Sequence, residues 1–81
     1  MRYFTTTNYI PVDNGEIKLR HLHMVHSQSV DLFIKRALNV DESSNVDSYL
    51  TSPNCWVSDN SNWIVREVSE AEFNLMKDEE Q

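Results

Sequence analysis

The feature that most constrains the fold of this chain is its single glycine, which follows an asparagine at Asn14-Gly15. A type I′ turn needs a positive φ at both central residues, and Asn and Gly adopt it at the lowest cost. Apolar and polar residues alternate on both sides of this pair, as they do in strands with one covered face. The pattern therefore predicts a two-stranded hairpin over roughly residues 3–25, with Asn14-Gly15 at its tip.

The predicted register determines which residues of the hairpin lie opposite each other. A two-residue tip places Val12 opposite Ile17 and Ile10 opposite Leu19. Continued toward the chain ends, the register pairs Asn8 with His21, Thr6 with His23 and Phe4 with Val25. We expect the face that carries Val12, Ile17, Ile10 and Leu19 to pack against helices. The opposite face then presents Tyr9, Pro11, Arg20, Leu22 and Met24.

Two helices are indicated by apolar spacing and by capping signals. Residues 30–38 carry apolar side chains at the i, i+3, i+4, i+7 and i+8 positions of one helical face, and Asn39 is suited to end that helix. Ser69-Glu70-Ala71-Glu72 has the sequence of a capping box. Val68 and Phe73 are placed to form the matching hydrophobic staple, so a second helix is predicted to begin at this point.

The segment between these helices is expected to hold a short helix and two strands. The short helix covers residues 46–50 and is ended by Pro53. Residues 55–57 and 63–68 are rich in the β-branched and aromatic side chains that favour strands. The order β-β-α-α-β-β-α predicts one α+β domain over residues 1–81: a small antiparallel sheet, made of the N-terminal hairpin and the C-terminal strands, with helices packed on one face.

Size, cysteine content and hydropathy set further expectations. A chain of 81 residues is near the lower limit for a self-sufficient core. Its N-terminal residues contain no apolar run suited to a signal peptide, and no other run is long enough to span a bilayer. Cys55 has no second cysteine with which to form an intramolecular disulfide. We therefore expect a cytoplasmic protein that does not associate with membranes.

Charge is distributed unevenly along the chain. Residues 1–40 carry five Lys and Arg against three Asp and Glu, whereas residues 41–81 carry two against ten. Such an acidic half repels phosphate backbones, so direct binding to nucleic acid is not expected. An acidic surface attracts a basic partner, or serves only to keep the protein in solution.

Catalytic signatures are absent from the sequence. The one glycine is needed in the turn, so neither a glycine-rich phosphate loop nor a G-x-S-x-G elbow occurs. Cys55 lies beside Trp56 in an apolar setting that favours an inert, buried thiol. Trp56 and Trp63 are expected to be core residues, the alternative being an aromatic platform for a ligand. We predict that the protein is not an enzyme and uses no cofactor.

The spacing His21-x-His23-x-x-His26 offers the one candidate metal site. On a strand, His21 and His23 point to the same side, where two imidazoles could bind one Zn²⁺ ion. His26 would join them only if the strand bends, and nothing in the spacing specifies a fourth ligand. The alternative is that the histidines line a sheet face and form hydrogen bonds with neighbours such as Asn8 and Thr6. We favour this alternative and predict no metal.

These observations favour a small acidic module that binds another protein. Its sharpest form is a compact inhibitor, of the kind that phages and mobile elements encode, docked on a basic surface that handles nucleic acid. The candidate partner-binding residues are Glu67, Glu70, Glu72, Asp78, Tyr9, Arg20, Leu22 and Met24. The alternatives are a metal-binding protein that uses the three histidines, and a homodimeric structural protein.

Overall fold

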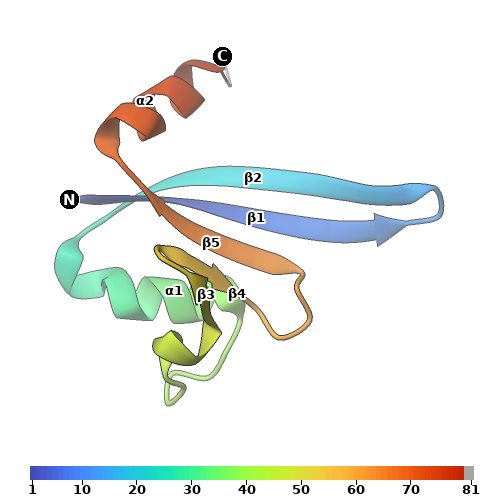
Figure 1. Ribbon diagram of the computed structural model, residues 1–81, viewed down its shortest axis with the longest axis horizontal. Helices are drawn as coiled ribbons and strands as arrows, with labels where there is room; N and C mark the ends of the chain where they lie inside the picture. The colour runs from blue at the N-terminus through green and yellow to red at the C-terminus, as the bar shows by residue number, and fades with distance from the viewer. Residues whose placement is uncertain (80–81) are drawn as a thin grey trace.

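The protein is an α+β domain built on one antiparallel sheet, as the sequence predicts, and this sheet has five strands rather than the four expected. The computed structural model describes residues 1–79. The strands are β1 (Arg2–Val12), β2 (Gly15–Val25), β3 (Leu50–Ser52), β4 (Cys55–Val57) and β5 (Trp63–Val68). They lie in the order β2-β1-β5-β4-β3 (Figure 1). The helices are α1 (Val30–Leu38) and α2 (Glu70–Glu79), with short 3-10 turns η1 (Ser27–Ser29) and η2 (Val46–Tyr49). Within residues 1–79, no helix is long and apolar enough to cross a membrane.

The N-terminal hairpin forms, but its register differs from the predicted one by two residues. Val12 pairs with Gly15 and Ile10 with Ile17, so the loop consists of Asp13 and Asn14. Neither loop residue has a positive φ, whereas Gly15 has a φ of 140°. The turn is therefore not type I′, because the glycine occupies the position after the loop. A shift of two residues leaves every side chain on its predicted face, since direction alternates with period two.

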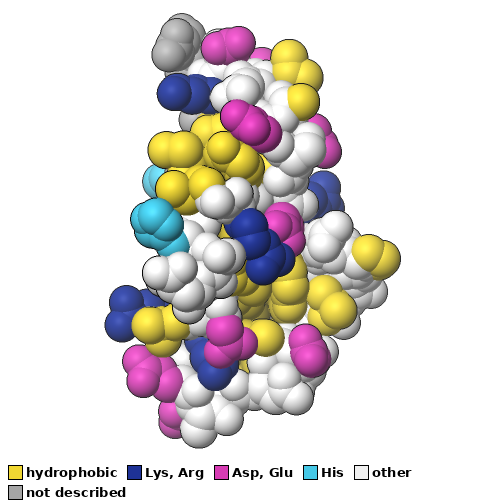
Figure 2. All heavy atoms as spheres, turned by 90° about the vertical axis from the view of Figure 1, so that its left-hand side faces the viewer, with side chains coloured by type: hydrophobic (Ala, Val, Ile, Leu, Met, Phe, Trp, Pro, Cys, Tyr) yellow, Lys and Arg dark blue, Asp and Glu magenta, His cyan; other side chains and the backbone are white. Residues whose placement is uncertain are grey.

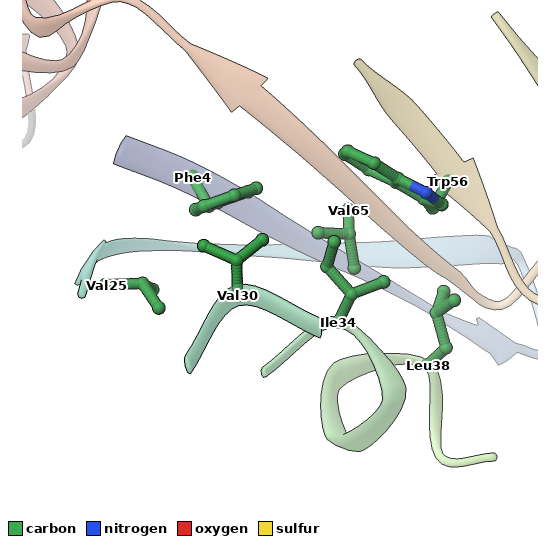
Figure 3. Packing of buried hydrophobic residues seen from close by; sticks show 7 residues of the cluster. All are labelled: Phe4, Val25, Val30, Ile34, Leu38, Trp56 and Val65. Carbon is green, nitrogen blue, oxygen red and sulfur yellow. The ribbon is translucent and has the colours of Figure 1, made fainter. Parts of the chain in front are cut away.

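The hydrophobic core lies between the sheet and α1. Phe4 of β1 and Val65 of β5 are fully buried and point toward α1, where Ile34 is 1 % exposed (Figure 3). The ring centroids of Phe4 and Phe33 lie 5.3 Å apart. Asn39 ends the helix in the left-handed region with a φ of 59°, as its side chain tolerates. The predicted helical face is therefore the face that packs on the sheet.

The predicted short helix over residues 46–50 is replaced by η2 and a strand. Residues 46–49 form the 3-10 turn, and the Asn45 side chain accepts a hydrogen bond from the Asp47 amide at its start. β3 then pairs with β4 through a turn in which Asn54 has a φ of 62°. Proline followed by a residue with positive φ is the arrangement of a type II turn. Pro53-Asn54 therefore closes a hairpin, whereas the sequence predicts only that Pro53 ends a helix.

The second helix, α2, lies on the face of the sheet opposite α1, contrary to the expectation that the helices share one face. Tyr3 and Phe4 are consecutive residues and point to opposite faces. Phe4 packs against α1, whereas the Tyr3 ring lies 5.0 Å from Phe73 of α2. Figure 1 shows the two helices on opposite sides of the sheet. The cause is the staple, because Val68 and Phe73 are both buried and Val68 pairs with Tyr3. The helix therefore follows Val68 onto the Tyr3 side.

The capping box at the start of α2 is present. The Ser69 hydroxyl accepts a hydrogen bond from the Glu72 amide at 3.1 Å. The same hydroxyl donates to the Glu72 carboxylate at 3.2 Å. In a capping box the carboxylate accepts from the backbone amide of the capping residue, whereas the Glu72 carboxylate contacts the Ser69 side chain instead.

Candidate functional site

Four of the predicted partner-binding residues line one face of the hairpin. Arg20, Leu22 and Met24 lie opposite Thr7, Thr5 and Tyr3, and directly paired residues of a sheet point to the same side. Tyr9 has the same parity along β1 as these partners. All four residues are therefore on the face that carries α2. Met24 pairs with Tyr3, and the Tyr3 ring contacts Phe73 of α2. These side chains of β2 therefore extend as far as the start of that helix.

Helix α2 adds acidic and apolar side chains to the same face. Glu70, Glu72 and Asp78 are exposed, and Phe73 is the buried residue that attaches the helix to the sheet. Leu75 of α2 and Met24 of β2 are 65 % and 61 % exposed. Figure 2 shows hydrophobic side chains gathered below α2, with acidic side chains of the helix above them. The fold thus brings the acidic and the apolar candidates to one side of the sheet.

Glu67 lies apart from the other acidic candidates. It pairs with Phe4 in the register and so is on the α1 face. Its carboxylate accepts two hydrogen bonds from the Arg2 guanidinium, at 2.6 and 2.7 Å. These bonds lower the pKa of Glu67 and raise that of Arg2. The Arg2 guanidinium carbon also lies 5.7 Å from the centroid of the Phe4 ring. Glu67 is therefore part of an ion pair that ties β1 to β5.

The histidine cluster consists of two neighbouring imidazoles and one that lies apart. His21 and His23 share the α1 face, with ring centroids 6.4 Å apart, whereas His26 follows the end of β2. His23 Nε2 lies 2.9 Å from the Thr6 hydroxyl, and its ring is 5.0 Å from Phe33. Burial, and then the charge of His21, lower the pKa of His23. Within the described chain, no three His, Cys, Asp or Glu side chains are grouped so that they could hold a metal ion.

A groove of about 800 Å³ lies between β2 and α1. Apolar side chains, among them Val25, Phe33 and Trp63, form much of its lining, and His21 and Arg36 also border it. None of its lining residues is acidic. Trp56 lies in the core, as predicted, and Trp63 is partly buried, packing against that core while it borders this groove. Trp56 is the buried one, and its indole N–H has no hydrogen-bond partner.

The outer half of the hairpin is an exposed surface, contrary to the expectation that its apolar face packs against helices. Val12, Ile17 and Leu19 are 45 %, 47 % and 44 % exposed. β5 pairs with β1 only from Tyr3 to Asn8, so neither it nor α1 extends over the tip (Figure 1). This exposure follows from the length of the strands, because the six residues of β5 cannot flank the eleven of β1.

Comparison of this chain with models of known protein families, with curated proteins and with solved structures finds no match.

Proposed function

We propose that the protein acts by binding another protein through the face formed by α2 and the neighbouring positions of β2. The observation that supports this proposal is that α2 and these side chains of β2 lie on the same side of the sheet. The exposed Met24 pairs with Tyr3, and Tyr3 contacts Phe73 of α2. Acidic side chains of the helix and apolar side chains of the strand therefore lie on the same side of the sheet. Apolar anchors beside charged groups are the composition of protein interfaces.

The chemistry of this surface favours a basic partner. The chain has a formal net charge of −6, and Glu70, Glu72 and Asp78 are exposed on a helix attached through one buried side chain. Acidic groups steer a protein toward a positively charged surface and raise the rate of association. A groove that holds nucleic acid presents such a surface. An acidic helix docked there excludes the phosphate backbone, so the protein acts as an inhibitor. The one, buried cysteine suits a reducing compartment, and we place the interaction in the cytoplasm.

The test is affinity capture with matched surface variants. Glu70→Lys combined with Asp78→Lys reverses two charges of α2 and leaves the Ser69–Glu72 cap intact. Glu42→Lys combined with Asp59→Lys makes the same change in net charge at exposed positions outside α2 and β2. Met24→Asp removes the apolar anchor. We expect wild-type protein to capture basic, nucleic-acid-handling proteins from nuclease-treated lysate, and the α2 and Met24 variants to lose them.

The control pair separates the proposed interface from net charge alone. If both charge-reversal variants lose the captured proteins equally, the acidic residues contribute only bulk charge, and the surface assigned here is wrong. If all variants retain them, the interface lies elsewhere. Raising the salt concentration is expected to weaken capture, because it screens exposed charges beyond a Debye length of about 10 Å at 0.1 M.

A further inference from the structure

The outer half of the hairpin extends beyond the rest of the sheet as a two-stranded ribbon. β5 pairs with β1 no further than Asn8, whereas β1 and β2 remain paired as far as Val12 and Gly15 (Figure 1). A two-stranded ribbon is at best marginally stable in water without a third strand or a covering element. The exposed side chain of Ile17 lies on this part of β2, and that of Leu19 lies at its inner end, opposite Asn8. The ribbon therefore lacks the support that the inner half obtains from β5 and α1.

β2 is also an edge strand along its whole length of eleven residues. Alternate residues of an edge strand direct backbone N–H and C=O groups outward, where they can pair with a strand of another chain. β2 contains no proline to prevent such pairing. Its outer half is therefore suited to receive one more strand.

The sequence of this segment is complementary to itself. An antiparallel pairing of two β2 strands centred on Lys18 places Ile17 opposite Leu19, on the face that carries α1. On the opposite face, the same pairing places Glu16 opposite Arg20. Two-fold symmetry produces each of these contacts twice. Apolar and oppositely charged side chains are therefore matched in one register.

Lys18 would meet its own copy at the centre of this pairing. Its ammonium nitrogen lies 6.0 Å from the centroid of the Tyr9 ring, and Tyr9 is the residue of β1 that pairs with Lys18. The side chain thus leans inward over β1 and away from the open edge. This direction separates the two ammonium groups, which would otherwise repel each other across the axis.

We propose that two copies of this chain associate through antiparallel pairing of β2 with β2, centred on Lys18. The occupant of the open edge is a second copy, because opposite charges and apolar side chains match in that register. Pairing converts two ribbons into one four-stranded sheet. The two-fold axis of this pairing is perpendicular to the plane of the joined sheets. The dimer therefore presents two acidic α2 helices on one face. This proposal does not depend on the identity of a basic partner.

The experiment exchanges the two charges that the register matches. Glu16→Arg places two arginines opposite each other, and Arg20→Glu places two glutamates there. Each variant alone is expected to dissociate roughly tenfold more readily than wild type, since two attractive pairs become repulsive. An equal mixture of the two variants restores opposite charges at both positions, and so does the double variant Glu16→Arg/Arg20→Glu. Sedimentation equilibrium on the purified full chain, near 0.1 mM, measures the mass of each sample.

The expected result is a dimer for wild type, the mixture and the double variant, with the single variants shifted toward monomer. Recovery in the mixture also shows that both single variants are folded. Wild type that remains monomeric near 0.1 mM overturns the proposal. So does a wild-type dimer that the single variants leave unchanged, because the copies would then meet through another surface. Loss of the dimer in Glu16→Arg, which changes no residue assigned to the partner-binding face, without loss of basic-protein capture leaves the proposed function intact.

Discussion

The two halves of the hairpin belong to one continuous β1–β2 ladder but have different surroundings. In the inner half, Phe4 is fully buried between α1 and its neighbouring strands. In the outer half, Ile17 and Leu19 point to the same face and remain almost half exposed. The difference arises because β5 is too short to follow β1 to its tip. Alternation determines the face on which a residue lies, and the length of the adjoining elements determines whether that face is covered.

The largest expected effect contrasts one isoleucine from each region. Ile34→Ala should lower the free energy of unfolding by about 2–5 kcal/mol, because it leaves a cavity in the core. Ile17→Ala should lower it by less than about 1 kcal/mol, since the side chain is largely in water. Urea unfolding of dilute protein, followed by tryptophan fluorescence, measures both values. Equal losses would show that the outer half is covered after all.

A second contrast concerns the two hairpin turns. Asn54 has a positive φ, so Asn54→Ala should cost about 1–2 kcal/mol in the left-handed region. Asn14 does not have one, so Asn14→Ala should cost much less. The same unfolding assay compares the two variants. A larger loss at Asn14 would favour the type I′ turn and contradict the observed register.

The Arg2–Glu67 ion pair of the inner half predicts a dependence on pH. Because Arg2 lowers the pKa of Glu67 in the folded protein, the pair stabilises it above the ordinary glutamate pKa of 4.5. That contribution is lost as the pH falls below this value, through the lower pKa of the folded state. The pair is partly exposed, so its contribution is about 0.5–1 kcal/mol. Glu67→Gln and Arg2→Gln should each remove the same acid-sensitive component from a plot of stability against pH. A component that survives in either variant belongs to other groups.

The smallest expected effect concerns His23, which lies beside Phe33 at the groove. Burial lowers the pKa of its imidazole, so the unfolded chain binds a proton more readily than the folded one. Stability should therefore fall as the pH drops through 6.5, the ordinary histidine value. His23→Gln should reduce this slope between about pH 7 and pH 5. An unchanged slope would mean that the imidazole titrates equally in both states.

Local signals predicted the elements of this fold more reliably than their placement. The apolar spacing of residues 30–38 gave the buried face of α1, because a helix of that pattern has one way to cover a sheet. The capping box located the start of α2. The side of the sheet to which α2 packs depended on Val68, whose parity along β5 differs from that of Val65. That parity is visible in the sequence only once the strand boundaries are known.

The candidate surface was predicted in part. Tyr9, Arg20, Leu22 and Met24 lie on the face that the alternation assigned to them. Glu67 is close in sequence to the acidic residues of α2, but sequence proximity does not distinguish a residue of a strand from one of a helix. Glu67 is the last residue but one of β5 and points to the Arg2 side, whereas Glu70 begins α2. A pairing partner 65 residues away is not encoded in any local pattern.

The most direct test of the account is hydrogen–deuterium exchange of the protein, free and bound to a basic protein that it captures. The account predicts slower exchange on binding in α2 and in residues 20–24 of β2, with no change in α1 or in β3 and β4. Slower exchange confined to α1 and the strands beyond β5, with α2 unaffected, would contradict it.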